Sequence, residues 1–132
     1  MQAQLQHYLD KLAYEIDSSD LHAALTANER IVVIDARTPE AYAREHIPGA
    51  VNVPHRTMDA ERTAGIDRAA ALVVTYCDGI GCNASTKGAL NMTKLGFQVK
   101  ELMGGLDWWK RDGYPTAGEA GSQGNSEILC GC

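Results

Sequence analysis

The chain has 132 residues, of which 45% are apolar and 22% are charged, an ordinary balance for a one-domain globular protein. Its formal net charge of −5 argues against non-specific binding to nucleic acid, and no apolar run is long enough to predict a transmembrane helix. The segment from Met1 to Asp17 lacks the cationic start and continuous apolar stretch of a signal peptide. We therefore expect a cytoplasmic protein with neither nucleic acid nor a membrane as its partner.

The chain begins with a segment whose apolar residues recur at helical spacing. An amphipathic helix is predicted because four of them fall at positions i, i+3, i+4 and i+7, namely Leu5, Tyr8, Leu9 and Leu12. We interpret residues 1–14 as an N-terminal helical extension. Ser18 and Ser19 can cap a second helix over residues 20–27, which starts with an acidic residue.

The next segments predict a buried strand, a helix and a short strand. Residues 31–34 form a β-branched run without alternation, which is typical of a strand buried on both faces of a parallel sheet. Thr38 and Pro39 fit the cap and first position of a helix that extends to about Glu45. After a Pro-Gly turn, residues 50–53 predict a short strand.

The second half of the chain predicts two further strands and two helices. Residues 55–70 are polar and weakly periodic, as in a loop with a short helix. A second buried strand is predicted at 72–76, followed by a helix over 84–95 that ends at a glycine. Residues 97–102 predict another strand, and 106–111 a short helix.

The alternation of strands and helices predicts an α/β domain with a mainly parallel sheet. We place this domain at residues 15–116. The remaining segment, 117–132, is rich in Gly and Ser and ends in Cys-Gly-Cys, so we expect a flexible tail. Ligands bind at the carboxyl ends of parallel strands, and Cys77 lies at such an end.

Cys77 is the first candidate for chemistry. A thiol reacts as its thiolate, and its ordinary pKa of about 8.5 must be lowered for reaction at neutral pH. Gly79 and Gly81 permit a loop whose N–H groups turn inward as a nest, and the helix after the loop directs its N-terminus toward the sulfur. These features favour a nucleophile, while a buried and inert thiol remains the alternative.

Three separated motifs carry a resemblance to a known family. They read VVIDARTPEAYAREHIPGAVNVP at 32–54, VVTYC at 73–77 and GFQVKELMGGLDWWKRDGYP at 96–115. In this order they resemble the single-domain rhodaneses over roughly residues 15–116. The resemblance implies a five-stranded, mainly parallel sheet flanked by helices on both faces. It also implies that Cys77 is the catalytic residue and carries a sulfane sulfur as a persulfide.

The same resemblance implies the partners and the surroundings of Cys77. The donor is thiosulfate or a persulfide, the acceptor is a thiol, cyanide or a protein, and neither a cofactor nor a metal is expected. Asp35 and Arg37 support the active-site loop by hydrogen bonds, the alternative being an ordinary salt bridge at a strand end. The loop itself is the cradle of the persulfide and comprises Asp78, Gly79, Ile80, Gly81, Cys82 and Asn83.

The loop departs from the family pattern in charge and length. It contains no basic residue, and Asp78 is expected to repel dianionic thiosulfate; the nearest cation in the sequence is Lys87. Cys77 and Asn83 are spaced like the Cys and Arg of Cys-x5-Arg phosphatases built on the same fold. Asn83 lacks the charge that clamps phosphate, which argues against a phosphatase or an arsenate reductase.

The other cysteines leave alternatives open. Cys82 either resolves a persulfide or sulfenate on Cys77 as a disulfide or packs as a small apolar residue. Cys130 and Cys132 can relay sulfur, bind a soft metal ion or have no role. The rival to a sulfurtransferase is therefore a non-catalytic module that binds a partner or senses redox state through Cys77 and Cys82.

Overall fold

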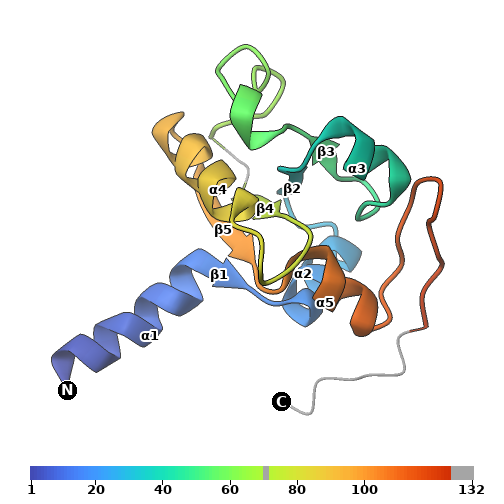
Figure 1. Ribbon diagram of the computed structural model, residues 1–132. Helices are drawn as coiled ribbons and strands as arrows, with labels where there is room; N and C mark the ends of the chain where they lie inside the picture. The colour runs from blue at the N-terminus through green and yellow to red at the C-terminus, as the bar shows by residue number, and fades with distance from the viewer. Residues whose placement is uncertain (70–71, 126–132) are drawn as a thin grey trace.

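The computed structural model describes residues 1–69 and 72–125, which form one parallel sheet with helices on both of its faces (Figure 1). The strand order is β1-β5-β4-β2-β3, and all four neighbouring pairs are parallel. The strands are β1 (Glu15–Ile16), β2 (Ile31–Asp35), β3 (Val51–Asn52), β4 (Leu72–Tyr76) and β5 (Gln98–Leu102). The predicted fold class, a five-stranded parallel sheet in an α/β domain, is confirmed.

Within residues 1–69 and 72–125, five α-helices and one 3-10 helix precede, connect or follow the strands. They are α1 (Gln2–Tyr14), α2 (Ser18–Thr26), α3 (Pro39–Arg44), η1 (His55–Thr57), α4 (Ala84–Lys94) and α5 (Gly105–Arg111). The predicted start of α3 is confirmed, because the Thr38 side chain accepts a hydrogen bond from the amide of Ala41 and Pro39 takes the first helical position.

The two central strands are buried on both faces, as their unbroken apolar runs predicted. Val74 of β4 packs on one face with residues of α2 and α5, including Leu21 and Trp109. Its neighbour Val73 points to the other face and packs with Met92 of α4. Because successive side chains of a strand alternate between the two faces, such a sandwich favours apolar residues on both faces of the strand.

The N-terminal helix α1 forms as predicted but extends away from the sheet (Figure 1). None of its residues is buried, and its apolar side chains remain largely exposed, with Leu12 73% exposed. The helical period of the apolar residues therefore predicted the helix correctly, although these side chains remain largely exposed. In the described residues, no helix is long and apolar enough to cross a membrane.

Three local features of the structure were not predicted from the sequence. The cap of α2 is Asp17, whose carboxylate accepts a hydrogen bond from the amide of Asp20, whereas Ser18 already lies inside the helix. The edge strand β1 was not predicted from the pattern, since two residues are too few to show a period. The hydrogen bonds between residues 117–125 and the domain, for example from Asn125 N to the carbonyl of Gly113, were not predicted either, and the flexibility of the tail stays a prediction.

We predict that Asp17→Ala lowers the free energy of unfolding by about 1 kcal/mol, because the first turn of α2 loses its side-chain acceptor. Urea denaturation followed by circular dichroism measures the change. Ser19→Ala is the control, since it keeps Asp17 in place, and it should change the value by less than about 0.5 kcal/mol. An equal loss in the two variants would show that Asp17 is not the cap.

Candidate active site

Cys77 directly follows β4, the central strand, and is almost fully buried, with 1% of its surface exposed. Its sulfur is bonded to that of Cys82 in a disulfide, with the two Cα atoms 6.3 Å apart. The structure therefore brings together the two thiols that the sequence had left as a candidate pair. Of the two alternatives for Cys82, inert packing is not what is observed.

Arg37 joins the end of β2 to the loop after β4. Its Nε and Nη2 donate hydrogen bonds to the two carboxylate oxygens of Asp35, at 3.0 and 2.7 Å. Its Nη1 donates to Oδ1 of Asp78 at 2.9 Å, and Nη2 also donates to the carbonyl of Glu45 at 2.6 Å. Arg37 thus contacts the loop directly through Asp78, while its role in supporting the loop stays a prediction.

This contact corrects the charge balance expected for the loop. The sequence pointed to Lys87 as the nearest cation and left Asp78 uncompensated. In the structure Asp78 forms an ion pair with Arg37, a residue 41 positions earlier in the chain. Because the Asp78 side chain is 71% exposed, solvent screens it as well, so its repulsion of an anion is weaker than the sequence suggested.

Asp35 is held from a second side by Tyr76. The Tyr76 hydroxyl donates to Oδ2 of Asp35 at 2.8 Å and accepts from the amide of Ile47 at 3.1 Å. Burial, together with the charge of Asp35, raises the pKa of Tyr76, so the hydroxyl remains a donor. Burial disfavours the charged form of Arg37 and by itself would lower its pKa. The hydrogen bonds to Asp35, the charge of Asp35 and the hydrogen bond to Asp78 outweigh this effect, so the pKa of Arg37 is raised.

The loop from Asp78 to Asn83 differs from the nest that its glycines predicted. Neither Gly79 nor Gly81 has a positive φ, and the amide of Cys82 donates to the carbonyl of Gly79 in a turn. That amide is therefore not available to a ligand in this state. The amides of Gly79, Ile80 and Gly81 donate no hydrogen bond within residues 1–69 and 72–125.

The loop is fastened to the start of α5. The amide of Leu106 donates to the carbonyl of Cys77 at 2.9 Å, and the amide of Asp107 donates to that of Asp78 at 2.8 Å. Gly105 permits this approach: a Cβ there would clash with the Cys77 carbonyl oxygen and lie 3.0 Å from the amide nitrogen of Gly79. Its φ of +57° also favours glycine. The backbone of Gly105 therefore lies against the start of the loop.

A cavity of about 260 Å³ lies beside the disulfide and is lined by both cysteines. Arg37, His55 and Arg56 border it, and so does Asp78, whose carboxylate is paired with Arg37. Burial, together with the charges of Lys87 and Arg56, lowers the pKa of His55 and so favours its neutral form. Sequence reasoning missed Arg56, because its only signal was its position just after a short strand.

The N-terminus of α4 also borders this cavity, through Ala84. Asn83 precedes the helix, but its side chain donates or accepts no capping bond. Asn83, the N-cap residue, therefore provides no side-chain acceptor for the first amides of α4. These amides follow Cys82 and Asn83 directly in the chain. Such a terminus favours a nearby negative charge.

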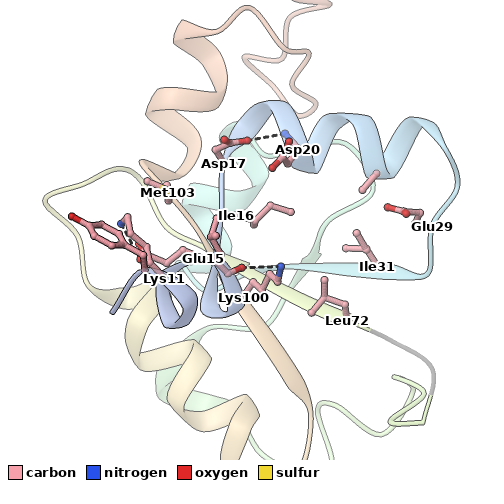
Figure 2. Close-up of a pocket in the computed structure, with 13 residues that line it drawn as sticks. Lys11, Glu15, Ile16, Asp17, Asp20, Glu29, Ile31, Leu72, Lys100 and Met103 are labelled. Carbon is pink, nitrogen blue, oxygen red and sulfur yellow. Dashed lines mark hydrogen bonds and ion pairs between the residues drawn. The ribbon is translucent and has the colours of Figure 1, made fainter. Parts of the chain in front are cut away.

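A second, larger cavity of about 480 Å³ lies apart from the cysteines (Figure 2). It is bounded by α1, β1 and the start of α2, and Leu12, Ile16 and Leu72 contribute its apolar lining. Lys100 spans it and donates to the carbonyl of Leu12 at 3.2 Å. Its lining includes neither Cys77 nor Cys82, so the cavity beside the disulfide is the candidate active site.

Cys130 and Cys132 lie outside the described residues, and the three alternatives for them stay open. Within the described ranges, no group of three or more His, Cys, Asp or Glu side chains is arranged to hold a metal ion.

A cysteine at the carboxyl end of the central parallel strand, followed by a short loop and a helix, defines a class of α/β proteins, and comparison with known proteins identifies the family. A family model described as a rhodanese-like domain matches residues 17–112. The chain therefore belongs to the rhodanese-like domain family. The resemblance inferred from the sequence motifs is confirmed.

The relatives of the chain include sulfurtransferases. The thiosulfate sulfurtransferase GlpE of Pseudomonas entomophila is 41% identical over 101 residues, which cover 75% of this chain and 84% of that protein. A sulfurtransferase of Allochromatium vinosum is 31% identical over 107 residues, 81% of this chain and 97% of that protein. The crystal structure of a protein from Bacillus halodurans aligns with a TM-score of 0.87 at 34% identity, covering 97% and 93% of the two chains.

We predict that Gly105→Ala lowers the free energy of unfolding by about 3 kcal/mol or more, since it combines a left-handed backbone with a clash against backbone atoms. Gly49→Ala is the matched control, because Gly49 also has a positive φ but nothing within 4 Å of the added Cβ. Gly49→Ala should lower the free energy of unfolding only by the cost of the left-handed backbone, about 1–2 kcal/mol. Urea denaturation of both variants in the same redox state measures the difference, and equal losses would contradict the close approach.

Proposed function

We propose that the protein is a sulfurtransferase that carries a sulfane sulfur on Cys77. The observation that carries this proposal is the position of the Cys77 sulfur. It is buried at the carboxyl end of β4, beside a cavity bordered by two arginines and by the N-terminus of α4. A nucleophilic thiolate and its anionic product both require such a positive environment.

The reaction begins with reduced protein, because the Cys77 sulfur is not nucleophilic while it is bonded to Cys82. The Cys77 thiolate attacks the outer sulfur of thiosulfate, the S–S bond of the donor breaks and sulfite leaves with the bonding electron pair. The product is Cys77–S–S⁻, a persulfide. A thiol, cyanide or a cysteine of a partner protein then removes the outer sulfur and regenerates the thiolate.

In this proposal the loop donates hydrogen bonds to the sulfur, whereas Arg37 and α5 hold the loop in place. The amides of Gly79, Ile80 and Gly81 lack protein acceptors among the described residues and lie two to four positions after Cys77 in the chain. Arg37 holds the loop through Asp78, and Gly105 lets α5 support it from behind. The donors are therefore fixed before charge develops on sulfur, which is how preorganised electrostatic stabilisation acts.

We predict that fully reduced protein mixed with thiosulfate gains one sulfur on Cys77. The clearest test is the intact mass of Cys82→Ser, in which the disulfide cannot form and the persulfide accumulates. Cys77→Ser should gain no sulfur, and sulfite release should fall at least 100-fold. Retention of the added sulfur by Cys77→Ser, or its absence from Cys82→Ser after both thiosulfate and a small persulfide, would contradict the proposal.

A redox module is the second candidate function, and the Cys77–Cys82 disulfide is the observation that favours it. Such a module would lose two hydrogens on mild oxidation, take up no sulfur and change its affinity for a partner. The experiment above separates the two candidates, because only a sulfurtransferase releases sulfite from thiosulfate.

We also predict that Asp78→Asn raises kcat/KM for thiosulfate roughly three- to tenfold at low ionic strength, because a carboxylate near the cavity is removed and Arg37 is freed from it. The gain should shrink as salt is added, since an exposed charge is screened. Steady-state kinetics at two ionic strengths measures both effects.

Asp67→Asn is the matched control for that variant. Asp67 is also exposed and paired with an arginine, Arg30, but this pair does not border the cavity beside the disulfide. Its kcat/KM should remain within twofold of the wild-type value. A loss of activity in Asp78→Asn would instead show that Asp78 matters by positioning the loop.

A further inference from the structure

We infer that Cys82 is a resolving cysteine: it attacks the persulfide on Cys77, releases hydrosulfide and leaves the Cys77–Cys82 disulfide, which a dithiol reductant then opens. This inference rests on the proposed function, because it needs the persulfide as its starting point. It adds a second activity to sulfur transfer, namely the reductive release of sulfide from thiosulfate.

The geometry of the disulfide carries the inference. The two sulfurs are bonded across a loop in which the cysteines are five positions apart, and a turn from Gly79 to Cys82 folds the second cysteine back toward the first. Cys82 therefore reaches the sulfur atom that belongs to Cys77 itself. In a persulfide this is the inner sulfur, and attack there expels the outer one.

The step balances in atoms and charge. Cys77–S–S⁻ reacts with the Cys82 thiol; the bond between the two persulfide sulfurs breaks, and a bond forms between the Sγ atoms of Cys77 and Cys82. The proton of Cys82 leaves with the outer sulfur as HS⁻. The released sulfur gains two electrons, one from each cysteine. A dithiol must therefore reduce the disulfide to restore both thiols, and is itself oxidised to a disulfide.

Competition with external acceptors favours the internal thiol. Cys77 is almost fully buried, so a thiol from solvent must enter the cavity to reach its persulfide. Cys82 is already on the same loop, which gives it an effective concentration far above that of small thiols in solution. In the described part of the chain Cys77 and Cys82 are bonded to each other, and no other cysteine lies near them.

The difference in exposure between the two cysteines sets the direction of reduction. Both line the cavity, but Cys82 is partly exposed, whereas Cys77 has only 1% of its surface exposed. A dithiol therefore attacks the sulfur of Cys82 and forms a mixed disulfide there. Cys77 leaves as a thiolate, which is the nucleophile that the next turnover needs.

A single-turnover experiment tests the inference. Fully reduced Cys130→Ser/Cys132→Ser protein, which has only the two loop cysteines, is freed of reductant and mixed with one equivalent of thiosulfate. We expect sulfite and hydrosulfide in equal amounts, and a protein mass two hydrogens below that of the reduced form. The further variants Cys82→Ser and Cys82→Ala should release the same sulfite, less than one tenth of the hydrosulfide, and retain one added sulfur.

The outcomes separate failure of the inference from failure of the proposed function. No sulfite from any variant overturns the proposed function. Sulfite without hydrosulfide from the protein that retains Cys82, with the added sulfur kept on Cys77, overturns the inference alone. Peptide mapping that finds the added sulfur on Cys82 also overturns it, since Cys82 would then have attacked the outer sulfur and would act as a relay.

Discussion

The structure depends on one buried ion pair, that between Arg37 and Asp35. Both side chains are nearly inaccessible to solvent, with exposures of 6% and 0%. Two charges of this kind are tolerated only where hydrogen bonds satisfy them, and removal of one partner leaves the other uncompensated at a cost of about 3–5 kcal/mol. Here Tyr76, Asp78 and the carbonyl of Glu45 supply the remaining hydrogen bonds. The pair is thus the centre of a network that joins β2, β4 and the end of α3.

This network sets the position of Cys77. Tyr76 is the last residue of β4, and its hydroxyl is bound to Asp35, while the next residue but one, Asp78, is bound to Arg37. Cys77 is therefore held in place by the hydrogen bonds of the residues on either side of it, Tyr76 and Asp78. On its other side, the amide of Leu106 holds its carbonyl, which leaves the sulfur as the part of the residue that faces the cavity.

The sequence predicted the elements of this arrangement better than their contacts. The runs at 31–34 and 72–76 indicated two buried parallel strands, and this placed Cys77 at a carboxyl end. The pairing of Arg37 with Asp78 depends on the register in which Asp35 lies beside Tyr76, and no local pattern reveals a contact 41 residues apart in the chain. Arg56 was missed for the same reason, because only the packed fold brings it to the cavity.

The absence of a cation from the loop then has a structural explanation. Arg37 lies just after β2, Arg56 lies in η1, and α4 begins where the loop ends, so the positive groups that border the cavity come from the elements around the loop. Because the loop itself need not supply positive charge, one of its positions can hold another functional group. Position 82 holds a cysteine whose sulfur is bonded to that of Cys77, and in the proposed reaction the same surrounding charges would stabilise the Cys77 thiolate or its persulfide.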